Sequence, residues 1–246
     1  MNANTLPKLS LEKLKILSSS ALKLIAIAAM LSGHITKFYF YHFTQIAATW
    51  PTATLFTIAG RAISFHKLLL MFGRFAFPIF AFQLVVGFEK TRDRKKYGLR
   101  LLILALISEL PFNLMLSHSL TYPTQNVIFT LFIGFLGLCA LEYFKERPLI
   151  RLLSLLVLLF ITRYLQADYR TAGFLFILLM YGLRNQKVIQ SIVSPTLLPM
   201  KAMVFLSFMV IYMYNGKRGF LKTKFWKYFF YAFYPLHMLI IYFLAR

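Results

Sequence analysis

The stretch "ALKLIAIAAMLSGHITKFYFYHF", residues 21–43, is apolar over almost its whole length. A helix needs about 20 mostly apolar residues to cross about 30 Å of hydrocarbon, so this stretch predicts a membrane-spanning helix. It is too long for the apolar core of a secretory signal peptide, and no small-residue cleavage site follows it. We therefore expect it to remain as the first span.

Further apolar stretches follow along the chain. Apolar residues make up 59% of the sequence, whereas an ordinary soluble domain has about 45–50%. We predict an all-α, polytopic membrane bundle of about eight helices, with seven to ten as the range. Residues 1–20 are expected to form a basic cytoplasmic segment and residues 21–246 a single transmembrane domain. The candidate spans are residues 21–43, 68–88, 99–117, 127–144, 149–161, 171–183, 202–214 and 226–244.

The net charge is strongly positive, with 28 Lys and Arg against 7 Asp and Glu, or +21. Such a charge is often a sign of nucleic-acid binding. Here, however, the cations lie in every second link between the predicted spans, at residues 89–100, 145–151 and 184–187. Basic links stay in the cytoplasm. We therefore expect a bacterial inner-membrane protein with a cytoplasmic N-terminus, the lipid bilayer as a partner and no nucleic acid.

One basic link departs from this alternation. Counting spans places "NGKRGFLKTKFWK", residues 215–227, outside the cell despite its charge. Either residues 202–214 do not cross the membrane, or residues 187–199 enter it and add a crossing. The charge favours the cytoplasmic side for residues 215–227.

Several familiar kinds of site are absent from the sequence. The single cysteine, Cys139, lies inside a predicted span, which excludes a disulfide within the chain and argues against a thiol nucleophile. The five histidines lie on separate segments without metal-ligand spacing, so no metal is expected. The phosphate-binding GxxxxGK[ST] and nucleophile-elbow GxSxG motifs are also missing.

Ionisable residues inside spans are costly and therefore informative. His34 suits a general base, because imidazole accepts a proton near neutral pH; alternatively it is a neutral ring bonded to a nearby carbonyl. His237, in "YAFYPLHMLIIY", raises the same two alternatives. Arg74 could hold an anion or a developing oxyanion, or form a structural ion pair with Glu109 or Asp168.

Each of the other polar residues could have either a structural or a functional role. Glu109 could pair with Arg74 or orient an imidazole. Asp168 could form a local ion pair with its neighbour Arg170. Asn126 stands where a helix would begin, so capping explains it as well as a site role does. Tyrosines near span ends are often interfacial aromatics.

Two basic links could hold a phosphorylated cofactor. These are "EKTRDRKKY", residues 89–97, and "NGKRG", residues 215–219, whose glycines allow backbone N–H groups to approach phosphate. The candidate cofactor-binding residues are Arg92, Lys96, Tyr97, Arg100, Lys217 and Arg218.

Several blocks in the same order resemble the TraX family of membrane acetyltransferases, known for acetylating the N-terminus of conjugative pilin. The blocks cover most of the chain: "LKLIAIAAMLSGHI" (22–35), "GRFAFPIFAFQLVVGFEKTRDRKKYGLRL" (73–101), "ISELPFNL" (107–114), "QNVIFTLFIG" (125–134), "ADYRTAGF" (167–174), "YNGKRG" (214–219) and "KYFFYAFYPLHMLIIY" (227–242). One position departs from the pattern: where family members commonly have Asp before the histidine of the first span, this chain has Gly33.

The resemblance implies transfer of an acetyl group from acetyl-CoA to a peptide N-terminus, a glycan or a lipid. Either histidine would be the base; we favour His34, in which case His237 would position the thioester or relay protons. Arg74 or Asn126 would stabilise the oxyanion, with Glu109 as a further catalytic residue. The expected acceptor-binding residues are Asn126, Asp168, Tyr169 and Tyr234. Two other functions remain: a proton-coupled or anion transporter, and a non-catalytic assembly subunit.

Overall fold

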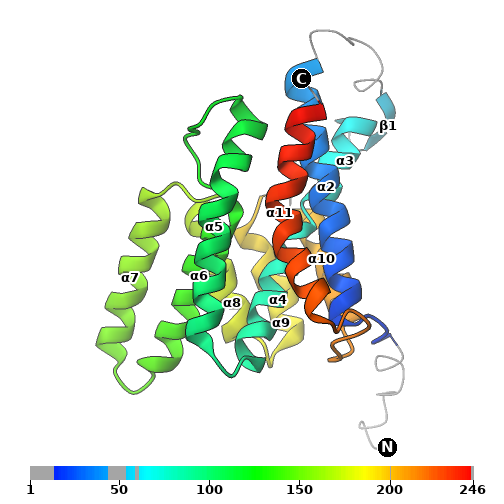
Figure 1. Ribbon diagram of the computed structural model, residues 1–246. Helices are drawn as coiled ribbons and strands as arrows, with labels where there is room; N and C mark the ends of the chain where they lie inside the picture. The colour runs from blue at the N-terminus through cyan, green and yellow to red at the C-terminus, as the bar shows by residue number, and fades with distance from the viewer. Residues whose placement is uncertain (1–13, 44–53, 59–60, 200, 245–246) are drawn as a thin grey trace, which may run out of the picture.

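The described part of the chain is mostly helical, with one short two-stranded hairpin (Figure 1). The computed structural model describes residues 14–43, 54–58, 61–199 and 201–244, so most of the predicted N-terminal segment lies outside the described residues. The elements are α2 (Ser19–Phe43), β1 (Thr54–Ile58), β2 (Arg61–Ser64), α3 (Phe65–Gly73), α4 (Ala76–Lys90), α5 (Arg94–Ser117), α6 (Val127–Tyr143), α7 (Pro148–Tyr164), α8 (Arg170–Gly182), α9 (Lys187–Val193), the 3-10 helix η1 (Ser194–Leu197), α10 (Lys201–Tyr212) and α11 (Lys224–Leu244).

Each predicted span contains a helix, which confirms the all-α class. Among the described residues, three helical stretches are long and apolar enough to cross a membrane by length and composition: Ser19–Phe38, Phe65–Lys90 and Arg94–Ser117. These apolar helices indicate a membrane protein. The number of spans, given as about eight from the sequence, stays a prediction.

The second predicted span, residues 68–88, is broken in the structure. α3 ends at Gly73 and α4 begins at Ala76, with a tight turn at Arg74 and Phe75 between them. Pro78 explains the position of the break, because it lacks the N–H that would bond to the Arg74 carbonyl in a continuous helix. The break places Arg74 at a bend between two helices instead of along a straight one.

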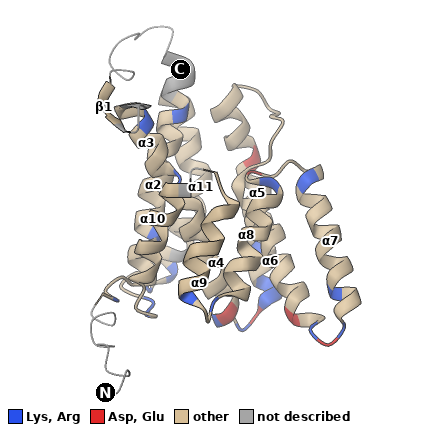
Figure 2. Cartoon of the chain, turned by 180° about the vertical axis from the view of Figure 1, so that it is seen from behind, with Lys and Arg blue, Asp and Glu red and all other residues tan. Residues whose placement is uncertain are grey.

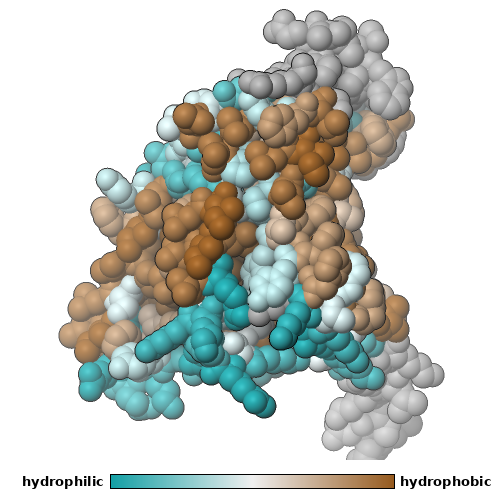
Figure 3. Space-filling view, in the orientation of Figure 1, coloured by the Kyte–Doolittle hydropathy of each residue, from teal (hydrophilic) through white to brown (hydrophobic). Residues whose placement is uncertain are grey.

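The basic links gather at one end of the bundle, called here the basic end (Figure 2). Lys90 Nζ donates to the Gly216 carbonyl at 2.9 Å, which brings residues 90 and 216 together. Arg184 Nε lies 2.8 Å from Glu89 Oε1, which brings in the link between α8 and α9. The surface is hydrophilic at this end and has a broad hydrophobic region above it (Figure 3).

The link at residues 215–227 also starts at the basic end. α9 turns back along α8, where Gln190 Nε2 donates to the Met180 carbonyl at 2.6 Å. α10 then returns the chain, and the Leu17 N–H donates to the Met213 carbonyl at 2.8 Å. The chain thus turns back into the bundle through α9 and η1. Whether this region adds a membrane crossing stays a prediction.

The "YNGKRG" loop caps the first helix. The backbone N–H groups of Ser19 and Ser20 donate to the carbonyls of Lys217 and Arg218 at 2.9 and 3.0 Å. The first N–H groups of a helix have no partner inside the helix. This loop supplies carbonyl partners for two of them, so its backbone holds the start of α2 in place.

Labelling of single cysteines tests the re-entrant path of α9 and α10. In a Cys139→Ser background, Asn185→Cys and Lys217→Cys should react with a membrane-impermeant maleimide from the same side, because both lie at the basic end. Leu120→Cys, in the link between α5 and α6 at the other end, should react from the opposite side. Labelling of Asn185→Cys and Lys217→Cys from opposite sides would contradict this path.

Candidate functional site

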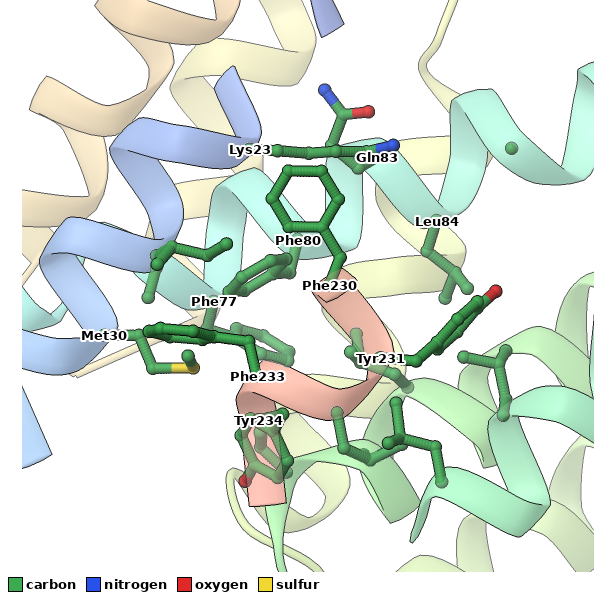
Figure 4. A pocket seen from close by; sticks show the side chains of 18 of the residues that line it. Lys23, Met30, Phe77, Phe80, Gln83, Leu84, Phe230, Tyr231, Phe233 and Tyr234 are labelled. Carbon is green, nitrogen blue, oxygen red and sulfur yellow. The ribbon is translucent and has the colours of Figure 1, made fainter. Parts of the chain in front are cut away.

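A cavity of about 530 Å³ runs into the bundle from the basic end. It lies mainly between α2, α4, α5 and α11 (Figure 4). Lys23 and Lys37 of α2 both line it, and their separation of 14 positions corresponds to about 21 Å at 1.5 Å per residue. The cavity is therefore elongated, with a mouth at the basic end, walls and an inner end.

Cations and amides surround the mouth of the cavity. The positively charged residues that line the mouth are Lys23, Lys90, Arg100 and Arg218. Ser19 Oγ donates to Gln83 Oε1 at 2.6 Å, which leaves Gln83 Nε2 buried without a partner among the described residues. Arg100 Nε is likewise buried without a hydrogen-bond partner among the described residues. Unpaired buried donors are costly, so the mouth is suited to an anionic or oxygen-rich ligand.

The walls beyond the mouth are aromatic. Phe77 and Phe80 of α4 face Phe230 and Phe233 of α11 across the cavity (Figure 4). Met30 of α2 adds a flexible apolar side chain to the same wall. This section can accommodate an apolar or linear group but offers few hydrogen bonds to it.

The inner end brings together residues from three segments. His34 and Lys37 come from α2, Arg74 from the bend before α4, and Asp168 and Tyr169 from the link before α8. Lys37 interacts electrostatically with Asp168. Arg74 interacts electrostatically with Tyr169. Asp168 is the one acidic residue among the described residues that line the cavity.

The link before α8 is held in an unusual backbone conformation. Tyr169 has a φ of 61°, which non-glycine residues seldom adopt. The Asp168 N–H donates to the Gln125 carbonyl at 3.0 Å, and Thr130 Oγ1 donates to the Asp168 carbonyl. The Tyr169 ring stacks on Phe77, with centroids 4.1 Å apart. These contacts fix the Asp168 and Tyr169 side chains at the inner end.

His34 and His237 are hydrogen-bonded to each other. His34 Nδ1 lies 2.8 Å from His237 Nε2, and His237 Nδ1 lies 2.8 Å from the Phe233 carbonyl oxygen. The two rings are parallel within 1° and their centroids are 5.1 Å apart. His34 lines the cavity, whereas His237 is 3% exposed and lies behind it. The sequence suggested both residues but not this contact.

Gly33 packs directly against Gly73. A Cβ built on Gly73 would lie 2.7 Å from Gly33 Cα, and a Cβ on Gly33 would lie 3.1 Å from Gly73 Cα. Two glycines therefore allow the backbones of α2 and α3 to touch beside His34. An aspartate at position 33 would not fit this contact without moving α3, which gives the departure noted at this position a packing reason.

Glu109 and Asn126 lie outside the cavity lining and bond to each other. Asn126 is fully buried; its Nδ2 donates to Glu109 Oε2 at 2.6 Å and to the Ala105 carbonyl at 2.9 Å. Its Oδ1 accepts from the Ile128 N–H at 3.0 Å, which caps α6. The amide is fully occupied, so the structure places Asn126 in a helix cap. Within the described part of the chain, no ion pair joins Arg74 to Glu109 or Asp168.

The candidate cofactor residues divide into two groups. Tyr97, Arg100 and Arg218 line the cavity, whereas Arg92, Lys96 and Lys217 do not. Lys96 Nζ instead lies 3.1 Å from Asp93 Oδ2. The Lys96 N–H donates to Asp93 Oδ1 at 2.9 Å, and this hydrogen bond holds the pKa of the Asp93 carboxyl below its usual value. Asp93 thus caps α5 and forms an ion pair with Lys96.

The cavity residues that sequence reasoning missed include Lys23, Lys37 and Gln83. Lys37 follows His34 by three residues, which places both on one face of a helix. That spacing was a usable signal. Gln83 gave none, because an uncharged amide in a span is a weak indicator of function. Among the described residues, no group of three His, Cys, Asp or Glu side chains is placed to hold a metal ion.

Substitution of the close-packed glycines tests the contact between α2 and α3. Gly73→Ala should lower the free energy of unfolding by about 1–3 kcal/mol, because the new methyl group collides with backbone atoms that cannot turn away. The measurement is thermal unfolding in detergent. Gly182→Ala is the matched control, since nothing lies within 4 Å of the added Cβ. Equal midpoints for the two variants would contradict the contact.

Comparison with known proteins agrees with the order of the sequence blocks. A family model described as TraX protein matches residues 18–245, which is nearly the whole chain. No curated protein and no solved structure matches the chain. The match includes both histidines, the bend at Arg74 and the loop that caps α2. The chain belongs to the TraX family.

Proposed function

We propose that this protein is a membrane-embedded acetyltransferase that moves an acetyl group from acetyl-CoA to an amine or hydroxyl acceptor. The observation that carries the proposal is the course of the cavity, which begins among four cations and ends at His34. Membership of the TraX family supports it. The acceptor class, whether a peptide N-terminus, a glycan or a lipid, is left open.

The mouth suits the nucleotide part of acetyl-CoA. Lys23, Lys90, Arg100 and Arg218 supply positive charge for its phosphates, and Gln83 Nε2 is a free donor beside them. The aromatic walls then suit the pantetheine arm, which is linear and only weakly polar. The inner end would receive the thioester. These are fits of charge and shape, and no metal is needed for them.

His34 is placed to act as the general base. In the proposed reaction its ring takes a proton from the acceptor amine or hydroxyl as that group attacks the thioester carbonyl carbon. Arg74, which has no acidic partner within the described chain, stabilises the negative charge on the carbonyl oxygen. The new C–N or C–O bond forms, the C–S bond breaks, and His34 returns its proton to the CoA thiolate.

The basic end would face the cytoplasm, where acetyl-CoA is made. Links rich in Lys and Arg stay on that side of the bacterial inner membrane. This orientation gives a multi-pass protein whose cavity opens to the cytoplasm. It also places His34 and Lys37 closer to the opposite face of the membrane, because they lie in the second half of α2.

Removal of the base tests the enzyme assignment. Purified protein in liposomes is given radiolabelled acetyl-CoA, and thiol release and label transfer are followed over a panel of peptide, glycan and lipid acceptors. His34→Gln should lower kcat by about 100-fold or more, as expected for loss of a general base. His118→Asn is the control, since His118 is exposed at the end of α5 and does not line the cavity.

The same assay can contradict the assignment. Wild-type protein that neither binds acetyl-CoA nor releases thiol with any acceptor would favour the transporter, because a transporter uses buried charges without needing CoA. Turnover that survives in a folded His34→Gln variant would instead reject His34 as the base and leave acetyl transfer in place.

Substitution of two neighbouring cations, one lining the mouth and one outside it, tests where acetyl-CoA binds. Arg218→Gln should raise KM for acetyl-CoA about fivefold, which corresponds to about 1 kcal/mol for a partly screened charge contact. Lys217→Gln removes the same charge one residue away but does not line the cavity, so KM should stay near the wild-type value. Equal changes in KM for the two variants would contradict phosphate binding inside the mouth.

A further inference from the structure

The hydrogen bonds around His237 determine where its proton lies. The Phe233 carbonyl oxygen, 2.8 Å from His237 Nδ1, can only accept a hydrogen bond. Nδ1 must therefore carry a hydrogen. A neutral imidazole has one N–H and one lone pair, so Nε2 of His237 is an acceptor. No carboxylate forms an ion pair with either histidine ring in the described part of the chain.

The same reasoning then extends to His34. His34 Nδ1 lies 2.8 Å from the acceptor Nε2 of His237, so His34 Nδ1 must donate. Parallel rings with centroids 5.1 Å apart fit an end-to-end N–H···N bond, since a face-to-face stack at that separation would not bring two nitrogens to 2.8 Å. With its hydrogen on Nδ1, His34 has its lone pair on Nε2.

The free nitrogen of His34 is the one that can reach the cavity. His34 lines the cavity, whereas His237 does not. Nδ1 is directed at His237, and Nε2 lies on another edge of the ring. Nε2 makes no hydrogen bond to a described residue, and it is not fully buried. It is therefore accessible from the cavity.

We propose that His237 is a positioning residue: it fixes His34 in the tautomer with hydrogen on Nδ1, so that the Nε2 lone pair faces the cavity. Free neutral histidine favours the other tautomer, with hydrogen on Nε2, which would block proton abstraction from the cavity side. The role in catalysis rests on the proposed acetyl transfer, whereas the tautomer is a property of the resting protein.

Aromatic packing holds His237 in the required orientation. Its ring stacks on Phe233, with centroids 5.1 Å apart and planes within 11°. Tyr234 meets both rings edge-on, 5.7 Å from His237 and 6.4 Å from His34. The ring is thus confined on several sides while both nitrogens keep their partners. Such support beyond the reacting group is typical of histidines whose tautomer matters.

Nitrogen NMR tests the tautomer without any substrate. Protein labelled with 15N-histidine in lipid bilayers should show His34 protonated at Nδ1, with His34→Gln used to assign its signals. In His237→Leu, which removes the acceptor, His34 should change to the Nε2–H form. His118→Asn is the control and should leave the His34 signals unchanged. A wild-type His34 with hydrogen on Nε2, or one unaffected by His237→Leu, would overturn the proposal.

Kinetics provide the second readout. His237→Leu should lower kcat about 100-fold with KM for acetyl-CoA unchanged, because the base is misoriented but the mouth is intact. His237→Gln keeps an oxygen that can accept from His34 Nδ1 and should recover a large part of the lost kcat. Equal losses in the Leu and Gln variants would contradict positioning. The NMR result stands even where no acceptor is turned over, so failure of the two proposals can be told apart.

Discussion

The hydrogen bond between His34 and His237 joins the first long helix of the bundle to the last. Two imidazoles buried inside the bundle need partners, because each unpaired polar group there costs free energy. The Phe233 carbonyl, His237 and His34 form one short chain of hydrogen bonds that meets this need. It requires α2 and α11 to lie in one relative position, and that position closes the inner end of the cavity.

Defects in the helices provide the rest of this inner end. Pro78 interrupts the second apolar stretch and turns Arg74 toward the cavity. The contact between Gly33 and Gly73 then lets α3 approach α2 beside His34. The cavity thus depends on residues with unusual backbone properties, not on the polar side chains alone. Regular helices with bulky residues at these positions would separate the charged groups.

The buried polar residues fall into two classes by their contacts. The Asn126 amide is fully occupied by Glu109, the Ala105 carbonyl and the start of α6, and both Asn126 and Glu109 lie outside the cavity lining. His34 and Arg74 line the cavity and retain groups that a ligand could use. This division separates the residues that hold the fold together from those that can meet a ligand.

The sequence alone determined the helical class, the apolar stretches, the basic links and the short set of ionisable residues within them. These properties follow from local composition and length, which a single stretch such as residues 21–43 carries by itself. Tertiary structure decided that His34 meets His237, 203 positions away, and that Asn126 serves a helix cap. It also brought Lys37 into the site. Hydropathy records how polar a residue is but not which face of a helix it occupies or which distant residue it meets.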